Sequence, residues 1–401
     1  MAWQSPLVDA AAKVGLADRV LGWYLLCLAL VAACLIVYPY PSRLPSKVVS
    51  KTSSHCSHLG PLSASEFHTR LSTLGKTLTA LNASAYIAEP GASALYYANI
   101  STPHWHLSER PLLLIADASA RVTVLTPKFK STRALLLSIL SDVMWVPYSQ
   151  LLDIKGTVFV DGSIRHFIVD GLRTAFPKAT VIAAPTKIRQ LRERKSEGEL
   201  ALLKRANEVH QTHKQMHIGM RESDARNLIA RALADAGLKD GGCLTLFGEN
   251  AALPHGSGTD RRLRPEDFAL FDCTASLHGY WSDVTRTLAL PASTIPKTHL
   301  QIWNIVHSAQ NIAFGTAHAG VVAKRVDEAT RFFLDLAGYA KNFTHRLGHG
   351  IGLEVHEDPN LNGGNEVILQ TGHTFSDEPR NGSAMYLTAG VGGPASSPWK
   401  P

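Results

Sequence analysis

Two aspartates lie eleven residues apart in a segment, Phe268–Leu288, that has the composition of a β-hairpin. The segment is rich in aromatic and β-branched residues and is interrupted by a glycine, which is typical of two strands joined by a tight turn. A two-residue loop at Leu277 and His278 would place Asp272 directly opposite Asp283. Like charges repel in that position, so a bound hard divalent cation with oxygen ligands is the simplest explanation. The alternative is a surface hairpin with two solvated carboxylates.

Further polar motifs flank the hairpin. Leu-Pro-His255-Gly precedes it, and His345-Arg-Leu-Gly-His349-Gly-Ile-Gly, Val-His356-Glu-Asp-Pro and Ser-Asp-Glu378-Pro follow it. In this order the motifs closely resemble the metallopeptidase family with the pita-bread fold, which includes Xaa-Pro aminopeptidases, prolidases, methionine aminopeptidases and creatinase. The resemblance extends over most of the chain.

The resemblance implies a centre of two divalent metal ions. The ligands carried over from the family are Asp272, Asp283, His349 and Glu378, and Glu378 would also handle the proton of the bridging water. Mn²⁺ is the expected metal because the ligands are mostly oxygen, with Co²⁺ and Zn²⁺ as alternatives. Two such cations lower the pKa of bound water towards neutrality.

The same resemblance implies a catalytic role for His255, His345 and His356 as groups that hydrogen-bond the substrate or the intermediate. Methionine aminopeptidases generally lack the N-terminal domain expected here, and creatinase does not rely on metals. The expected substrate is therefore a proline-containing peptide, cleaved before proline by an aminopeptidase or a dipeptidase. Proline lacks a backbone N–H and fixes φ, so this bond requires a dedicated pocket.

One departure from the family concerns the last metal ligand. The family supplies a metal-bridging glutamate from a final Arg-x-Glu-Asp-like segment, whereas residues 380–401 contain no Asp or Glu. A truncated or mis-spliced C-terminus would explain this difference. The alternative is a non-catalytic pita-bread homologue that acts as a peptide- or protein-binding module. In both cases this chain, as given, is expected to bind metal poorly and to turn over little.

The elements that must position these residues are predicted to form an α+β protein. A pita-bread domain, meaning a curved antiparallel sheet with outer helices, is expected to follow an α/β creatinase-like N-terminal domain. The expected divisions are an N-terminal tail (1–20), a transmembrane anchor (21–38), a stalk (39–61), the N-terminal domain (62–193), the incomplete metallopeptidase domain (194–379) and an atypical tail (380–401).

Apolar periodicity and turn residues place the individual elements. A helix is expected to open at Ser63 with Glu66 completing a capping box, and another helix is expected to open with Ser196 as its cap. Strands are predicted at 85–87, 112–116, 122–126, 157–160 and 180–183, and helices at 131–141, 164–175, 223–237, 297–317 and 326–337.

The segment Leu21–Tyr38 is eighteen residues long and carries no charge, with Trp and Tyr near its ends. Such a run is close to the length of a bilayer crossing, so a single-pass membrane location is predicted. A buried soluble helix and a cleaved signal peptide are the alternatives. The side of the membrane stays open, because flanking Lys and Arg favour the cytoplasm whereas four N-x-S/T sequons would permit glycosylation in the lumen.

Composition adds weaker constraints on the chain of 401 residues. The net charge of +7 is spread, and the basic run Arg189–Lys195 is interpreted as a charged linker, so no nucleic-acid partner is expected. The five cysteines show no C-x-x-C spacing, so a disulfide scaffold is not expected and Cys273 is assigned to packing. The resemblance makes a homodimer one option for the assembly.

Overall fold

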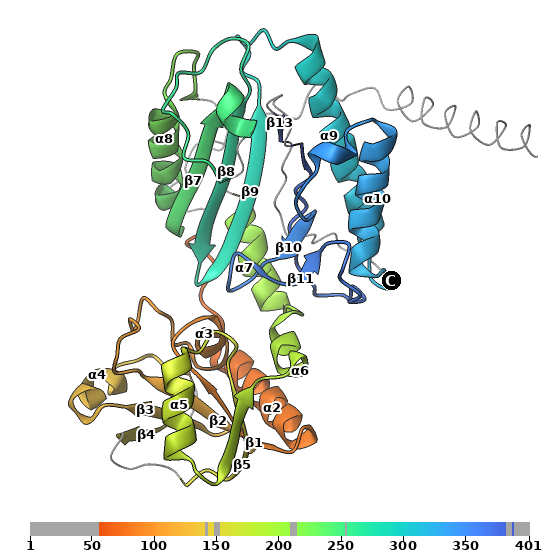
Figure 1. Cartoon of the computed structure of the whole chain (residues 1–401). Coiled ribbons are helices and arrows are strands. Elements are labelled where there is room, and N and C mark those ends of the chain that lie inside the picture. The colour runs from red at the N-terminus through yellow and green to blue at the C-terminus, as the bar shows by residue number, and fades with distance from the viewer. Residues whose placement is uncertain are drawn as a thin grey trace, which may run out of the picture. The chain divides into compact units, whose positions relative to one another are not determined.

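The structure is a computed structural model, which describes residues 56–140, 143–147, 153–208, 215–252, 255–381 and 387–388. All of these residues belong to one compact unit, shown as a ribbon in Figure 1.

The first half of this unit is built on a six-stranded mixed sheet. Its strand order is β4-β3-β2-β1-β5-β6. The β1–β2 and β2–β3 pairs are antiparallel, whereas β3–β4, β1–β5 and β5–β6 are parallel. The strands are β1 (Ala83–Ala88), β2 (Leu113–Asp117), β3 (Val122–Thr126), β4 (Val143–Pro147), β5 (Gly156–Val160) and β6 (Ala179–Ala183).

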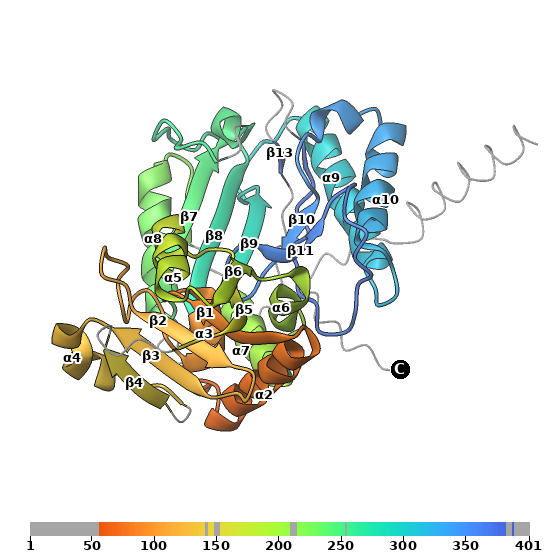
Figure 2. The ribbon, with the colours of Figure 1, turned by 60° about the horizontal axis from the view of Figure 1, so that its bottom comes forward.

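Helices cover both faces of this sheet, as Figure 2 shows. Helix α2 (Ala64–Ala80) buries Leu71, Leu74 and Leu78 against one face, and α5 (His166–Ala175) buries Ile168 and Leu172 against the other. Strands buried on both faces are typical of α/β layers. Three shorter helices complete this half: α3 (Ala92–Ala98), α4 (Ser131–Leu135) and α6 (Thr186–Arg189).

The second half contains the hairpin within a three-stranded antiparallel sheet of order β7-β8-β9. Helix α8 packs against β7, and α7 packs against β8 and β9, while α9 and α10 pair beside the short β10–β11 sheet (Figure 1). The elements are α7 (Glu197–Asn207), α8 (Glu222–Asp235), β7 (Lys239–Phe247), β8 (Ala269–Leu277), β9 (Tyr280–Leu288), α9 (Lys297–Thr316), α10 (Ala323–Leu336), β10 (Gly348–Gly350), β11 (Glu357–Leu361), β12 (Arg380–Asn381) and β13 (Leu387–Thr388).

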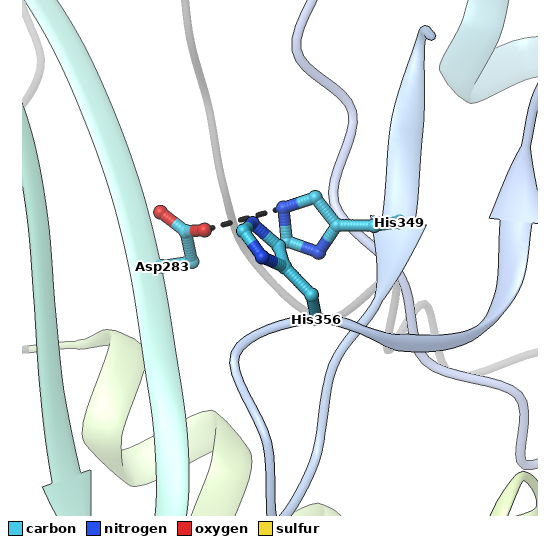
Figure 3. A group of neighbouring side chains, drawn as sticks. All are labelled: Asp283, His349 and His356. Carbon is cyan, nitrogen blue, oxygen red and sulfur yellow. Dashed lines mark ion pairs between the residues drawn. The ribbon is translucent and has the colours of Figure 1, made fainter. Parts of the chain in front are cut away.

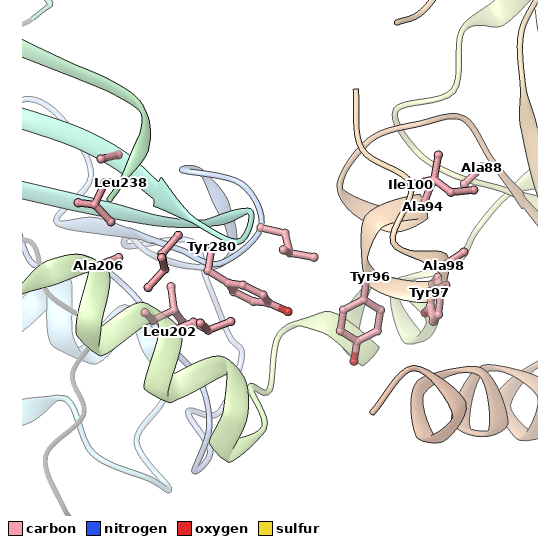
Figure 4. Packing of buried hydrophobic residues seen from close by; sticks show 14 of the residues in the cluster. Ala88, Ala94, Tyr96, Tyr97, Ala98, Ile100, Leu202, Ala206, Leu238 and Tyr280 are labelled. Carbon is pink, nitrogen blue, oxygen red and sulfur yellow. The ribbon is translucent and has the colours of Figure 1, made fainter. Parts of the chain in front are cut away.

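One hydrophobic cluster joins the two halves. Tyr96 and Tyr97 of α3 belong to the same buried cluster as Leu202 of α7 and Tyr280 of β9. Figure 4 shows the rings of Tyr96 and Tyr280 between these elements. The hairpin that carries the two aspartates is therefore anchored at its turn end to the first half of the molecule.

Most predicted elements are confirmed within a few residues, with three corrections. Strand β4 was not predicted, and the helix expected at 131–141 ends at Leu135. Ser63 precedes α2 but its side chain makes no cap hydrogen bond, so the prediction of a capping box with Glu66 is wrong. Ser196, by contrast, forms a complete capping box with Glu199. The domain limits stay predictions.

The predicted transmembrane helix requires a further correction. Among the described residues, no helix combines the length and the apolar character needed to cross a bilayer. The predicted anchor, Leu21–Tyr38, lies outside the described residues. The fold class that included this helix, the single-pass membrane location and the membrane as a partner are therefore not retained.

Candidate metal centre

The hairpin forms as predicted, but its register differs from the prediction by two residues. Asp272 pairs with Thr285, and Asp283 pairs with Thr274. The two-residue turn is His278-Gly279, with φ of 51° and 86°, because a hairpin turn of this kind needs residues that tolerate positive φ and glycine does so without strain.

This register changes how the two carboxylates meet. Asp272 and Asp283 do not face each other directly, and are diagonal neighbours on the same face of the two-stranded ribbon. Their shared face still allows both to approach one cation.

Close backbone contacts bring the later motifs to this face. The amide of Ser376 donates to the carbonyl of His349 (2.8 Å), and the amide of Glu378 donates to that of Leu347 (2.9 Å). A Cβ on Gly348 would lie 2.0 Å from the Ser376 carbonyl oxygen. Only glycine permits this approach, which sets His349 and Glu378 side by side.

Two carboxylates, those of Asp283 and Glu378, converge on one atom, the Nε2 of His349. This nitrogen lies 3.4 Å from an oxygen of Asp283 and 3.1 Å from Oε1 of Glu378. The ring of His356 packs edge-on against that of His349, with centroids 4.2 Å apart (Figure 3). The other ring nitrogen of His349, Nδ1, lies 3.0 Å from the Gly350 carbonyl oxygen and can donate to it, which orients Nε2 towards the carboxylates.

The electrostatics of this cluster show a deficit of positive charge. Burial, together with the charges of Glu378 and Asp272, raises the pKa of Asp283 to about 6 despite the opposing effect of His349. Burial lowers the pKa of His349, but its contacts with Asp283 and Glu378 outweigh that effect and raise it to about 9.

A buried oxygen adds to this evidence. Oδ1 of Asp283 is buried and has no hydrogen-bond partner, and an orphaned buried carboxylate oxygen is costly unless a cation satisfies it. One possible ligand set consists of Asp283, His349 and His356, whose ligand atoms all lie within 4.8 Å of one another. The sequence interpretation did not consider His356 as a ligand, because the family resemblance placed it with the substrate.

The other two predicted catalytic residues are His255 and His345. His255 is exposed, and its charge contributes to lowering the pKa of His356, after burial and the charges of His349 and Arg346. His345 is half-buried, with Nδ1 2.6 Å from the Arg346 carbonyl oxygen. Of the seven predicted residues, the structure thus brings Asp272, Asp283, His349, His356 and Glu378 together, with His255 at the edge.

Known proteins resemble this chain in sequence. Residues 201–394 match the family described as "Metallopeptidase family M24". An uncharacterised peptidase of Schizosaccharomyces pombe is 34% identical over 355 residues, which cover 82% of this chain and 77% of that relative. The chain belongs to metallopeptidase family M24.

Solved structures show that the fold of this M24 metallopeptidase is also shared. The dipeptidase PepE from Mycobacterium ulcerans superposes with a TM-score of 0.72 at 26% identity, covering 83% of this chain and 92% of that one. A prolidase from Thermococcus sibiricus superposes with a TM-score of 0.70 at 24% identity, covering 83% and 94%, and at this identity the likeness concerns the fold alone. The pita-bread fold is therefore confirmed.

This M24 chain contains one covalent link that the sequence interpretation missed. Cys243 of β7 and Cys273 of β8 are directly opposite in the register and form a disulfide. A spacing of 30 residues without a local motif gave no signal for this pair. Cys273 and Asp272 are adjacent in β8, and successive side chains of a strand point to opposite faces. The disulfide therefore lies on the opposite face of the strand from the proposed metal ligand Asp272.

Proposed function

We propose that this chain hydrolyses the peptide bond on the N-terminal side of proline with the help of two divalent cations. The observation that carries the proposal is the convergence of Asp283 and Glu378 on Nε2 of His349, with one buried Asp283 oxygen unsatisfied. Family membership supplies the reaction class.

The residues fit a pair of hard divalent cations. Asp272, Asp283 and Glu378 provide carboxylate oxygens and His349 provides a ring nitrogen, which suits Mn²⁺, with Co²⁺ or Zn²⁺ as alternatives. When bound, two such cations supply a nucleophilic water at neutral pH and polarise the scissile carbonyl.

The chain's own side chains would move the protons and orient the peptide. Glu378, whose side chain is 14% exposed, is the proposed base that takes a proton from the attacking water. His356 lies at the edge of the cluster, exposed beside His349, where its ring can donate to the substrate carbonyl. His255 and His345 are proposed to hydrogen-bond the rest of the substrate.

The preference for a short, proline-containing substrate rests on analogy. One neighbour is a prolidase and another is a dipeptidase. The dipeptidase neighbour, at 26% identity, supports a short peptide substrate. The proline itself is proposed from the resemblance of the His255, His345 and His356 motifs to Xaa-Pro peptidases, with cleavage either of a dipeptide or at the N-terminus of a longer peptide. A homodimer stays a prediction, which light scattering would check.

We also propose that activity is impaired in the chain as given. No acidic residue follows Glu378, so the family's last bridging carboxylate has no counterpart there. With one ligand fewer, the second cation should bind weakly. The same observation favours the second candidate function, a protein that binds peptides without cleaving them.

The deciding experiment measures hydrolysis of a Xaa-Pro dipeptide after chelation and again after addition of Mn²⁺. The chain is compared with its His349→Ala variant and with a version extended by an Arg-x-Glu-Asp segment. We expect metal-dependent cleavage that is abolished in His349→Ala and increased by the extension. Equal activity with and without the extension would contradict the impairment. Peptide binding without cleavage in both versions would favour the binding protein.

A further inference from the structure

The junction segment Arg192–Lys195, which leads into α7, contacts both loops of the candidate metal centre. Nη2 of Arg192 lies 2.6 Å from Oε2 of Glu354, in the loop that carries His356. The amide of Lys195 donates to the carbonyl of Gly372 (2.8 Å), in the turn that precedes Glu378. This segment is therefore a bracket for two loops that lie 162 and 177 residues further along the chain.

The strongest contact in the bracket is a buried ion pair between Lys195 and Glu357. The two side chains are 1% and 6% exposed. Nζ of Lys195 also lies within hydrogen-bond distance of the carbonyl oxygens of Arg192 (2.7 Å) and Glu193 (3.3 Å). The three donors of the ammonium group thus have three acceptors, which holds the ammonium in one geometry. Oε2 of Glu357 is buried without a hydrogen-bond partner and lies 3.9 Å from Nη2 of Arg192.

Glu357 directly follows His356, and the two side chains contact different parts of the molecule. Glu357 contacts Lys195 at the junction, whereas His356 packs on His349 in the metal centre. Figure 3 shows His356 beside His349 and Asp283. Fixing the side chain of Glu357 therefore also fixes the backbone from which His356 projects.

The same ion pair packs against the glycine-rich segment after His349. A Cβ on Gly352 would lie 2.4 Å from Oε1 of Glu357 and 2.6 Å from Cε of Lys195. The carbonyl of Gly352 accepts a hydrogen bond from the amide of Trp281 (2.8 Å), two residues before Asp283. The pair thus lies against backbone that is connected to both His349 and Asp283.

We infer that Lys195 is a positioning residue, which aims the imidazole of His356 into the metal centre through its buried ion pair with Glu357. Lys195 would act through Glu357 and not by contact with substrate or metal. The inference rests on the proposed function only in that His356 is taken to contact the substrate. It assigns the basic run at the junction a role beyond that of a linker.

The test measures the environment of His356 without requiring activity. The full chain, stripped of metal, is treated with diethyl pyrocarbonate, and the carbethoxylation rate of each histidine is followed by peptide mass spectrometry. His166, whose side chain is 84% exposed, is the internal reference. In Lys195→Met we expect the rate at His356 to change, while the rate at His166 stays constant. Lys324→Met, which removes the partner of the exposed Glu366, is the matched control and should change neither rate.

A second comparison separates positioning from general stability. Lys195→Met leaves the buried carboxylate of Glu357 with only the more distant Arg192, at 3.9 Å. Lys195→Met with Glu357→Met removes both charges of the close pair, so the double variant should restore folding. Where the extended chain is active, Lys195→Met should lower kcat by about 10-fold with little change in KM. If Lys195→Met does not fold, Glu357→Gln, which retains an acceptor, gives the same comparison.

The possible outcomes separate the positioning role of Lys195 from the proposed function. A wild-type carbethoxylation rate at His356 in folded Lys195→Met or Glu357→Gln would overturn the inference. If the carbethoxylation rate at His356 responds to these variants while the extended chain shows no peptidase activity with Mn²⁺, the result would count against the proposed function but would support the positioning role.

Discussion

At His349, one ring nitrogen faces a backbone carbonyl and the other faces two carboxylates. Without a cation, a proton on this ring is what balances Asp283 and Glu378, which explains why the pKa of His349 rises to about 9. A divalent cation would take the place of that proton and satisfy Oδ1 of Asp283 as well.

Replacing Asp283 by asparagine should therefore separate metal binding from folding. Asp283→Asn keeps the shape of the side chain but removes the charge, so Mn²⁺ affinity should fall by more than the roughly 10- to 100-fold typical of residues that only support a ligand. Titration calorimetry measures this change. Asp377→Asn is the matched control. Burial and the charge of Glu378 raise the pKa of Asp377 well above its usual range, so replacing this carboxyl by an amide removes little negative charge. An equal loss of affinity in both variants would contradict the assignment.

A second residue-scale prediction concerns acid stability. Burial, with the charges of Lys195 and Arg194, lowers the pKa of His373 from 6.5 to about 4. The unfolded chain then binds the proton more readily than the folded one, so stability from this group is present above pH 6.5 and is lost as the pH falls towards 4. In His373→Gln, the urea concentration at the unfolding midpoint should fall less steeply than in the unmodified chain as the pH is lowered from 6.5 towards 4. Parallel curves for the two proteins would refute the assignment.

At the scale of elements, the sequence predicts those helices and strands whose positions depend on local sequence pattern. The helices α8, α9 and α10 follow apolar periodicity, and their observed bounds differ from the prediction by at most three residues at either end. The hairpin register was missed because composition does not distinguish a Leu277-His278 loop from His278-Gly279. Strand β4 is short, partly exposed and an edge strand, so it carries little alternation to detect.

The turn gives a prediction at this scale. Gly279 has φ of 86°, and a Cβ there would lie 2.7 Å from Cδ2 of Leu95, so Gly279→Ala should cost about 1–3 kcal/mol of stability. Gly162→Ala is the control, because nothing lies within 4 Å of its Cβ position and its effect should stay within about 0.5 kcal/mol. Chemical denaturation measures both, and a stable Gly279→Ala would argue against the His278-Gly279 turn.

At the scale of the whole molecule, buried polar contacts couple the two halves. Nη2 of Arg70 in α2 donates to the hydroxyl of Tyr280 (3.1 Å), 210 residues away, and lies 3.3 Å from Oε1 of Glu199. The Tyr280 hydroxyl in turn donates to Glu199 (2.9 Å). Neither this network nor the Lys195–Glu357 pair follows from local sequence, because both depend on segments that meet only in the folded chain.

The Arg70 network gives the last prediction. The side chains of Arg70 and Glu199 are 4% and 2% exposed, so Arg70→Met would leave a buried carboxylate unpaired and should cost about 3–5 kcal/mol. Arg70→Met combined with Glu199→Met should cost less than Arg70→Met alone, because no charge is then left buried without a partner. Arg121→Met removes an ion pair whose arginine is 81% exposed and should cost no more than about 1 kcal/mol. Urea denaturation of the three variants measures these differences. If the double variant were less stable than Arg70→Met, Glu199 would stabilise the fold through its capping box with Ser196 and its hydrogen bond from Tyr280, and not through its charge pair with Arg70.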